Sequence, residues 1–309
     1  MKSVSIVVPV YNEEDNIEHF CRSVEEVMAP LGYDYEILFV DDGSRDGSRE
    51  ILLGLEESDK HVGAIFLARN SGHQLALTCG LDHAESDAVI TMDGDMQHPP
   101  EIIPMLLEQW EHGYDVVQTI RKTTEGVSAF KRLTSKGYYK LLNALSDVPI
   151  QPGGSDFRLM DRRVVLAFRK YREHARFIRG MVGAMGFRQI QVEFVAPPRF
   201  AGVSKFSLRK MMRFALDGIL AYSSVPLRWA FYMGLFSGLC SILLLIHVFY
   251  ATWKGDAVAG WATITVCILF FGGIQMVFLG IIGEYIGRIF EEAKGRPLYL
   301  VAKEKSLKS

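Results

Sequence analysis

The sequence predicts an α/β domain with a mostly parallel sheet, followed by a hairpin of two transmembrane helices. Between residue 3 and about residue 120, short β-rich runs alternate with amphipathic helical stretches. The last third of the chain contains two long apolar runs that lack charged residues. Continuous apolar strands between helices are typical of parallel sheets that helices cover on both faces.

The first 120 residues are expected to form five strands and four helices. The strand sequences are SVSIVVPV, YEILFV, VGAIFL, AVITM and YDVVQT, and the helices fall near 13–28, 47–57, 73–84 and 100–112. Polar residues follow each strand, in PVYNEED, DDGSRDG, RNSGH, DGDMQH and RKTTEG. Parallel sheets bind ligands outside the carboxyl ends of their strands, so five such clusters predict a ligand site at one edge of the sheet.

The segment MDGDMQHPPE, residues 92–101, places Asp93 and Asp95 one residue apart at the end of a buried strand. Two carboxylates this close repel each other unless a cation lies between them. A polar turn and a divalent-cation site both account for the pair, and this segment alone leaves both open.

Asp41 and Asp42 end the second strand, and two interpretations apply to them. They could cap the helix near 47–57, although Ser44 or Asp46 is better placed for that role. If Ser44 or Asp46 caps the helix, Asp41 and Asp42 are available to bind a ligand. Neither GxGxxG at the first helix nor GxxxxGK[ST] occurs, and the acidic spacing of a calcium-binding EF-hand is missing.

Two apolar runs, Trp229 to Trp253 and Ala257 to Gly283, contain no charged residue. Each exceeds the roughly 20 residues that cross a bilayer. Basic residues flank them on both sides: Arg209, Lys210, Arg213, Arg228, Arg288, Lys294, Arg296, Lys303, Lys305 and Lys308. The positive-inside rule therefore places the α/β domain and both termini in the cytoplasm, with the protein in the inner (plasma) membrane.

The expected organisation has four parts. Residues 1–205 form the α/β domain, 206–228 an amphipathic interfacial helix, 229–285 the two transmembrane helices (about 229–253 and 257–283), and 286–309 a cytoplasmic tail. Within 206–222, one helical face is apolar and the other basic, as at a membrane surface, although a helix packed on the domain has the same pattern. Its apolar face comprises Leu208, Met211, Met212, Ala215, Leu216 and Ile219.

Composition excludes several classes of protein. The net charge of −2 argues against a general nucleic-acid binder, which carries a basic surplus. The four cysteines, Cys21, Cys79, Cys240 and Cys267, contain no CxxC pair and are expected to be free thiols. No signal peptide is recognisable at the start of the sequence.

The motifs together resemble the family 2 glycosyltransferases of the GT-A fold, which is Rossmann-like. The likeness is specifically to the polyprenyl-phosphate glycosyltransferases that include dolichol-phosphate mannose synthases and bactoprenol glucosyltransferases. The matching segments are VVPVYNEE (7–14), VDDGSRDGS (40–48), NSGHQLAL (70–77), DGDMQHPPE (93–101), GGSDFRLMDR (153–162), RFAGVSKF (199–206) and IGEYIGRIFEEAKGRPLY (282–299). The resemblance implies a nucleotide-sugar donor, a divalent metal and a lipid-phosphate acceptor.

The resemblance also implies roles for individual residues on the donor side. Asp93 and Asp95 match the family's DXD metal ligands, with Gln97 as a third, and Mg²⁺ or Mn²⁺ suits oxygen ligands of this kind. The residues that match nucleotide-binding positions are Pro9, Tyr11, Glu13, Asp41, Asp42 and Asp93. A carboxylate such as that of Asp42 is a good acceptor for ribose hydroxyls. The alternative interpretation of Tyr11 is an exposed aromatic residue at the end of a strand, with no role in nucleotide binding.

Binding of the negatively charged acceptor phosphate requires positively charged side chains. The expected phosphate-binding residues are Arg121, Arg132, Ser135, Arg199 and Lys205. Asp156 matches the family's catalytic aspartate and, with Asp95, completes the expected catalytic residues. A phosphate monoester, however, has a second pKa near about 6 and is already a nucleophile at neutral pH. Asp156 is therefore expected to act as a base or to orient an arginine or the acceptor.

The expected reaction is inverting transfer of glucose from UDP-glucose to undecaprenyl phosphate by a metal-dependent homo-oligomeric enzyme, with a tetramer as one form. The same fold and motifs would also serve the transfer of N-acetylglucosamine, mannose or a modified pentose. A processive polysaccharide synthase is disfavoured because VPLRW (225–229) has valine where its QxxRW motif has glutamine. A non-catalytic membrane-tethered scaffold is disfavoured because Asp93 and Asp95 are intact.

Overall fold

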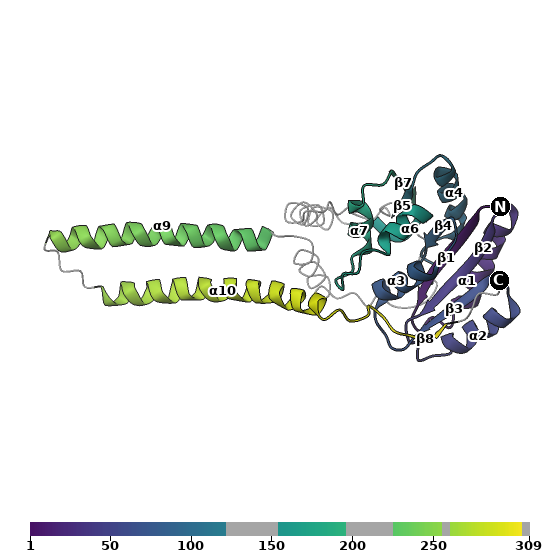
Figure 1. Ribbon diagram of the computed structural model, residues 1–309, viewed down its shortest axis with the longest axis horizontal. Helices are drawn as coiled ribbons and strands as arrows, with labels where there is room; N and C mark the ends of the chain where they lie inside the picture. Colours follow the sequence, from purple (N-terminus) through teal and green to yellow (C-terminus); the bar gives the residue numbers. More distant parts are fainter. Residues whose placement is uncertain (122–153, 196–224, 255–259, 305–309) are drawn as a thin grey trace. The chain divides into compact units, whose positions relative to one another are not determined.

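The computed structural model describes residues 1–121, 154–195, 225–254 and 260–304. The chain divides into two compact units. One contains Met1–Tyr139, Pro149–Phe206 and Arg296–Ser309, and is called the α/β unit below. The other contains Lys140–Val148 and Ser207–Gly295, and its described part is a helical hairpin (Figure 1).

The α/β unit is built on one sheet with the strand order β7-β5-β6-β4-β1-β2-β3-β8 among the described residues. The strands are β1 (Ser3–Val10), β2 (Asp34–Asp41), β3 (Val62–Leu67), β4 (Ala88–Thr91), β5 (Val116–Arg121), β6 (Gly154–Asp161), β7 (Gln189–Phe194) and β8 (Val301–Glu304). Strands β1 to β4 are mutually parallel, and β7 is parallel to β5. The predicted, mostly parallel sheet is confirmed, with all five expected strands.

Helices cover both faces of this sheet (Figure 1). They are α1 (Ile17–Met28), α2 (Ser48–Ser58), α3 (His73–His83), α4 (Ile103–Glu111), α6 (Arg162–Phe168) and α7 (Ile178–Ala184), with 3-10 turns at Ala29–Leu31 and Pro100–Ile102. Alternate β1 residues Val4, Ile6 and Val8 join one buried cluster with α1, α2 and α4. Helix α3 packs on β1 so closely that a Cβ at Gly80 would lie 2.2 Å from Val7 Cγ1, which accounts for glycine there.

Strand β6 determines where the polar residues of the sheet meet. It runs antiparallel between β4 and β5, with Thr91 opposite Arg158. Its first residues therefore lie at the edge where the parallel strands end, which is called the carboxyl edge below. In this register Asp156, two residues before Arg158, lies beside the turn that follows β4. The motif GGSDFRLMDR thus reaches the same edge as the five predicted clusters.

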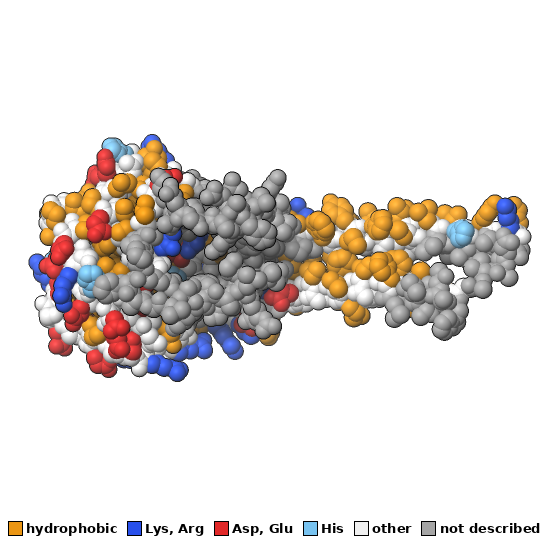
Figure 2. Space-filling view, turned by 180° about the vertical axis from the view of Figure 1, so that it is seen from behind, with side chains coloured by type: hydrophobic (Ala, Val, Ile, Leu, Met, Phe, Trp, Pro, Cys, Tyr) orange, Lys and Arg blue, Asp and Glu red, His pale blue; other side chains and the backbone are white. Residues whose placement is uncertain are grey.

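The described part of the second unit is a pair of long helices, α9 (Val225–Trp253) and α10 (Trp261–Ala293), which run side by side in opposite directions (Figure 1). Hydrophobic side chains line both helices on the face in Figure 2, and Phe231, Phe249 and Ile268 are 69%, 69% and 66% exposed. By length and composition, the described stretch Phe270–Ala293 is sufficient to cross a bilayer, and Leu227–Leu243 is a shorter apolar stretch. Exposed apolar surface of this extent is typical of a membrane-contacting segment.

The C-terminal segment, residues 296–304, belongs to the α/β unit, a feature that the predicted tail did not include. Strand β8 pairs with β3 in antiparallel orientation, and Ala68 N donates to Leu300 O at 2.8 Å. The Tyr299 hydroxyl donates to Asp82 Oδ2 at 2.8 Å, and the same oxygen pairs with Arg172 at 2.6 Å. The chain that leaves α10 is therefore tied to the edge of the sheet and to α3.

Replacing Tyr299 with phenylalanine should destabilise the α/β unit. The change removes a hydrogen bond to a buried carboxylate, and such bonds contribute about 1.5–3 kcal/mol. Urea unfolding of the detergent-solubilised full chain should show a lower midpoint. Tyr171→Phe is the matched control, because Tyr171 is 41% exposed and the same hydroxyl is removed from the surface. Equal midpoints for the two variants would contradict a stabilising role for the Tyr299 contact.

Candidate active site

The turn after β4 carries the two closely spaced aspartates. Gly94 separates them and is buried, and a Cβ there would lie 3.2 Å from Val10 Cγ1, so a larger residue would press on the core. Asp95 Oδ1 accepts from Gln97 N at 3.1 Å, and Met96 has a positive φ of 59°. The turn interpretation is thus right for Asp95. It does not exclude a cation, because an ionised carboxylate has about four acceptor positions.

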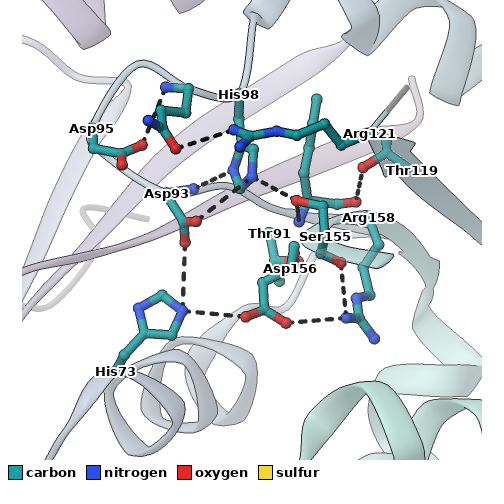
Figure 3. Close-up of polar contacts among 12 residues, drawn as sticks. His73, Thr91, Asp93, Asp95, His98, Thr119, Arg121, Ser155, Asp156 and Arg158 are labelled. Carbon is teal, nitrogen blue, oxygen red and sulfur yellow. Dashed lines mark hydrogen bonds and ion pairs between the residues drawn. The ribbon is translucent and has the colours of Figure 1, made fainter. Parts of the chain in front are cut away.

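His98 joins this turn to β6 (Figure 3). Its Nδ1 accepts from Asp93 N at 2.9 Å, so in the neutral ring the proton is on Nε2. That Nε2 lies 2.6 Å from Ser155 Oγ and 3.6 Å from Asp93 Oδ2. The ring is only 4% exposed, and this burial lowers the pKa of His98 despite the nearby Asp93. His98 therefore acts as a neutral link between the aspartate turn and the start of β6.

Asp156 is a buried carboxylate surrounded by donors. Arg179 donates through Nε to Oδ1 at 2.9 Å and through Nη2 to Oδ2 at 3.1 Å. Arg158 Nη2 donates to Oδ1 at 3.2 Å, and Gln74 Nε2 to Oδ2 at 3.2 Å. Burial alone would raise the pKa of Asp156, but its contacts with His73, Arg179 and Arg158 outweigh burial and hold the pKa well below its ordinary value.

His73, the first residue of α3, lies between the two carboxylates (Figure 3). Its Nε2 is 3.4 Å from Asp93 Oδ1 and 3.5 Å from Asp156 Oδ2. Burial lowers the pKa of His73, whereas Asp156 and Asp93 raise it, and the net effect is a raised pKa. The sequence analysis assigned no role to His73, although it is the last residue of the polar cluster after β3.

Of the five residues predicted to bind the acceptor phosphate, Arg121 is the one that lies within the described part of the chain. It ends β5, and its Nη2 donates to Gln97 Oε1 at 3.0 Å. The contact brings a guanidinium to the aspartate turn. It also shows that the Gln97 oxygen, predicted as a third metal ligand, accepts a hydrogen bond from a cation. Arg132, Ser135, Arg199 and Lys205 lie outside the described residues, and their roles remain predictions.

The predicted nucleotide-binding residues lie on the loops after β1 and β2. Asp42 is 3% exposed and accepts from Ser71 N at 2.6 Å and Gly72 N at 2.9 Å, which fixes the loop before α3. Burial raises the pKa of Asp42, and these two N–H groups offset part of that effect. Asp41 Oδ1 accepts from Ser44 N at 3.0 Å.

Helix capping by Asp41 or Asp42 was the alternative interpretation, and it is wrong. Asp46 Oδ1 accepts from Ser48 N, the first N–H of α2, at 3.1 Å. The sequence analysis had favoured Asp46 or Ser44 for this role. The two strand-end aspartates instead stabilise loops at the carboxyl edge.

The first loop is more exposed than the second. Tyr11 in the first loop is 42% exposed, whereas Asp42 at the start of the second loop is 3% exposed. Pro9 is buried within β1. Glu13 Oε2 accepts from Asn16 Nδ2 at 2.6 Å, and Asn12 Oδ1 accepts from Arg45 N at 2.8 Å. The loops after β1 and β2 are therefore hydrogen-bonded to each other, with Tyr11 accessible beside them. Its nucleotide-binding role remains a prediction.

Within the described part of the chain, no group of three or more His, Cys, Asp or Glu side chains is arranged to hold a metal ion. Asp93 and Asp95 offer two carboxylates on one turn, and the side chain of Asp93 is 34% exposed. Mg²⁺ commonly binds one or two carboxylates together with substrate phosphates and water. The residues present therefore fit an ion whose remaining ligands come from a bound phosphate group.

Comparison with known proteins agrees with this arrangement. Residues 5–167 match glycosyl transferase family 2, and residues 225–289 match the GtrB C-terminal hairpin. The chain belongs to glycosyl transferase family 2. The predicted resemblance, the fold class and the assignment as a glycosyltransferase are confirmed.

Similar proteins share nearly the full length of the chain. An uncharacterized glycosyltransferase of Synechocystis sp. is 42% identical over 306 residues, which cover 97% of this chain and 94% of that protein. The bactoprenol glucosyl transferase of Shigella phage SfV is 40% identical over 309 residues, covering 98% and 99%. The prophage bactoprenol glucosyl transferase homolog of Escherichia coli K12 is 39% identical over 309 residues, with the same coverage.

A more distant likeness exists among solved structures. Glucosyl-3-phosphoglycerate synthase of Mycobacterium tuberculosis, in complex with Mn²⁺, UDP and glucosyl-3-phosphoglycerate, is 19% identical and covers 71% of this chain and 78% of its own. The TM-score is 0.45.

His98→Ala should loosen the aspartate turn and destabilise the α/β unit. The variant removes the acceptor of Asp93 N, at a cost of roughly 1–3 kcal/mol if that group stays buried and unpaired, and it leaves Ser155 Oγ with its contact to Phe157 N. Thermal unfolding should show a lower Tm. His112→Ala is the control because His112 is exposed at the end of α4. An unchanged Tm for His98→Ala would show that His98 does not hold the turn.

Proposed function

We propose that the protein transfers glucose from UDP-glucose to undecaprenyl phosphate, with inversion at the anomeric carbon, at the cytoplasmic face of the membrane. The observation that carries the proposal is the near-full-length identity of about 40% to bactoprenol glucosyl transferases, hairpin included. The carboxyl edge supports it, because Asp93, Asp95 and Arg121 meet there at one turn and Arg179 pairs with the buried Asp156 beside it.

The donor side requires compensation of negative charge. As the sugar leaves, charge builds up on the diphosphate of UDP, and Asp93 and Asp95 would hold a Mg²⁺ or Mn²⁺ ion that neutralises it as a Lewis acid. Gln97 would bind the ion through its carbonyl oxygen or keep its hydrogen bond with Arg121. Arg121 was predicted to bind the acceptor phosphate. Because its guanidinium contacts Gln97 beside the two aspartates, we propose instead that it donates charge-assisted hydrogen bonds to the donor diphosphate. Asp95 is thus proposed as catalytic through the metal.

The nucleoside half of the donor would lie over the first two loops. Tyr11 offers an exposed ring for the base, and Glu13 and Asp42 offer acceptors for ribose hydroxyls. Pro9 and Asp41 would shape this site from within the strands. Since Asp42 already accepts two backbone N–H groups, we propose that its main contribution is the conformation of the 70–72 loop.

The acceptor oxygen needs little activation. A phosphate monoester is mostly dianionic at neutral pH, so its oxygen can attack the anomeric carbon without losing a proton. The new bond forms as the bond to UDP breaks, and UDP leaves with the electron pair. Asp156, whose pKa is held well below its ordinary value, is a weak base. We therefore propose an orienting role for Asp156.

The hairpin would anchor the enzyme in the inner membrane. We propose that α9 and α10 span it in opposite directions, with the catalytic domain and both termini in the cytoplasm and residues 206–228 at the surface of the inner leaflet. Residues 206–224 lie outside the described residues, so the interfacial helix remains a prediction, as does the homo-oligomer. The alternative sugars and the non-catalytic scaffold are outcomes of the experiment that follows.

A panel of nucleotide sugars assayed with a short polyprenyl phosphate tests the proposed reaction. We expect UDP-glucose to give product at least tenfold faster than UDP-N-acetylglucosamine, GDP-mannose or a pentose donor. Asp95→Asn and excess EDTA should each reduce transfer by about 100-fold or more, since each removes the charge that neutralises the diphosphate.

The controls separate the alternatives. Asp115→Asn changes an aspartate at the opposite edge of the sheet, just before β5, and should keep the transfer rate. Faster use of another donor would replace glucose in the proposal. Full activity in excess EDTA would exclude a role of the metal in transfer. If no donor supported transfer, the non-catalytic scaffold would be the remaining interpretation.

The proposed topology predicts which side of the membrane each end of the hairpin faces. Lys254→Cys, placed at the end of α9, should react with a membrane-impermeant maleimide in intact cells. Lys294→Cys, just after α10, should react only after the membrane is made permeable. Both variants are made with Cys240 and Cys267 replaced by serine. Equal labelling of the two positions in intact cells would contradict two spans with a cytoplasmic domain.

A further inference from the structure

Arg179 is the exposed arginine of the ion cluster around Asp156, and no motif in the sequence pointed to it. Its Nε and Nη2 pair with both oxygens of Asp156, at 2.9 and 3.1 Å. The Arg179 side chain is 42% exposed, whereas that of Asp156 is 8% exposed. The guanidinium therefore connects a buried carboxylate with the surface at the carboxyl edge.

The surrounding structure holds Arg179 in this position from two sides. Gln74 donates through Nε2 to Asp156 Oδ2, and its Oε1 accepts from Ile178 N at 3.2 Å. Ile178 is the residue before Arg179, so this amide bridges Asp156 and the start of α7. Arg158, which is 1% exposed, donates to Asp156 Oδ1 from within the sheet. The orientation of Arg179 thus depends on Asp156.

Within the described part of the chain, two arginines and a histidine surround Asp156. Asp156 is one carboxylate in contact with two guanidinium groups, Arg158 and Arg179, and also with His73. Asp93 lies on the other side of His73 and belongs to the proposed metal site. Arg158 is inaccessible, and its Nε and Nη1 have no hydrogen-bond partner among the described residues. Of these groups, Arg179 and His73 are the ones that an anion can reach from the surface, because their side chains are 42% and 43% exposed.

We propose that Arg179 binds the phosphate group of the polyprenyl acceptor and that Asp156 is the positioning residue that orients it. This inference rests on the proposed function. With Nε and Nη2 turned to Asp156, the planar guanidinium directs Nη1 away from that carboxylate, where a phosphate oxygen can accept a charge-assisted bond. The donor diphosphate is assigned to the aspartate turn, where Arg121 lies, and His73 separates that turn from Asp156.

Steady-state kinetics of Arg179→Lys and Arg179→Gln test the assignment, with the full chain in nanodiscs and a short polyprenyl phosphate as the acceptor. At saturating UDP-glucose, the acceptor KM should rise at least tenfold in Arg179→Gln and less in Arg179→Lys, which keeps the charge but loses the fork. The affinity for UDP with Mn²⁺, measured by calorimetry, should stay within twofold of wild type.

Arg163→Gln is the matched control. Arg163 pairs with Asp115 and Asp161 and is 72% exposed, but it lies after β6, at the opposite edge of the sheet. Its substitution should change neither the acceptor KM nor the UDP affinity. A fall in UDP affinity parallel to activity in Arg179→Gln would assign Arg179 to the donor diphosphate and overturn the proposal. A collapse of Tm confined to Arg179→Gln and Arg179→Lys would reveal a structural role and overturn it too.

Asp156→Asn separates positioning from base catalysis. A positioning residue predicts the same rise in acceptor KM as in Arg179→Gln, and a double variant no worse than either single one, because the two side chains act as one unit. A general base predicts a fall in kcat at unchanged acceptor KM, and that result would overturn the proposal. Wild-type enzyme inactive on every polyprenyl phosphate would remove the proposed function itself. An active wild type with unaltered Arg179 variants would overturn this inference alone.

Discussion

A buried carboxylate at the start of β6 is the constraint on which the rest of the site depends. An ionised Asp156 in the interior is tolerated only if charged or hydrogen-bonded partners replace the water that it loses. Those partners come from α3, from β6 itself and from α7, so they have to be brought together by the fold. The stability of this part of the domain and the layout of its candidate active site therefore have the same physical origin.

The position of β6 decides which groups share the carboxyl edge. An antiparallel strand between two parallel ones starts where its neighbours end, and this places Asp156 beside the turn of Asp93 and Asp95. His98 and Thr91 then join β6 to that turn and to β4, through Ser155 Oγ and the Asp156 carbonyl oxygen. Carboxylates that suit a cation and arginines that suit phosphate thus lie within one small region, without needing adjacent positions in the chain.

The C-terminal segment links the two units covalently at a defined point on the sheet. Because β8 pairs with β3 and Tyr299 contacts Asp82 on α3, the segment after α10 is bound both to the sheet and to the helix that carries His73 and Gln74. Edge strands with unpaired N–H and C=O groups invite association with other chains; β8 pairs with β3 and is itself the short, four-residue strand at that edge. The segment thus extends the sheet by one strand.

The sequence by itself determined the local elements and the position of the aspartate turn at the end of a strand. Apolar runs such as Val4–Val10 and the two long stretches near the C-terminus predict strands and membrane helices, because an uninterrupted apolar run and its length are visible in the sequence. The residues Asp93, Asp95 and Arg121 were predicted because they follow strands whose ends meet. Only the tertiary structure brought Arg179, Gln74 and His73 to Asp156, and only it showed that Asp42 is occupied by backbone N–H groups. These contacts join segments up to 104 residues apart, as between Ile178 and Gln74, and depend on strand order and helix packing, which leave no local pattern in the sequence.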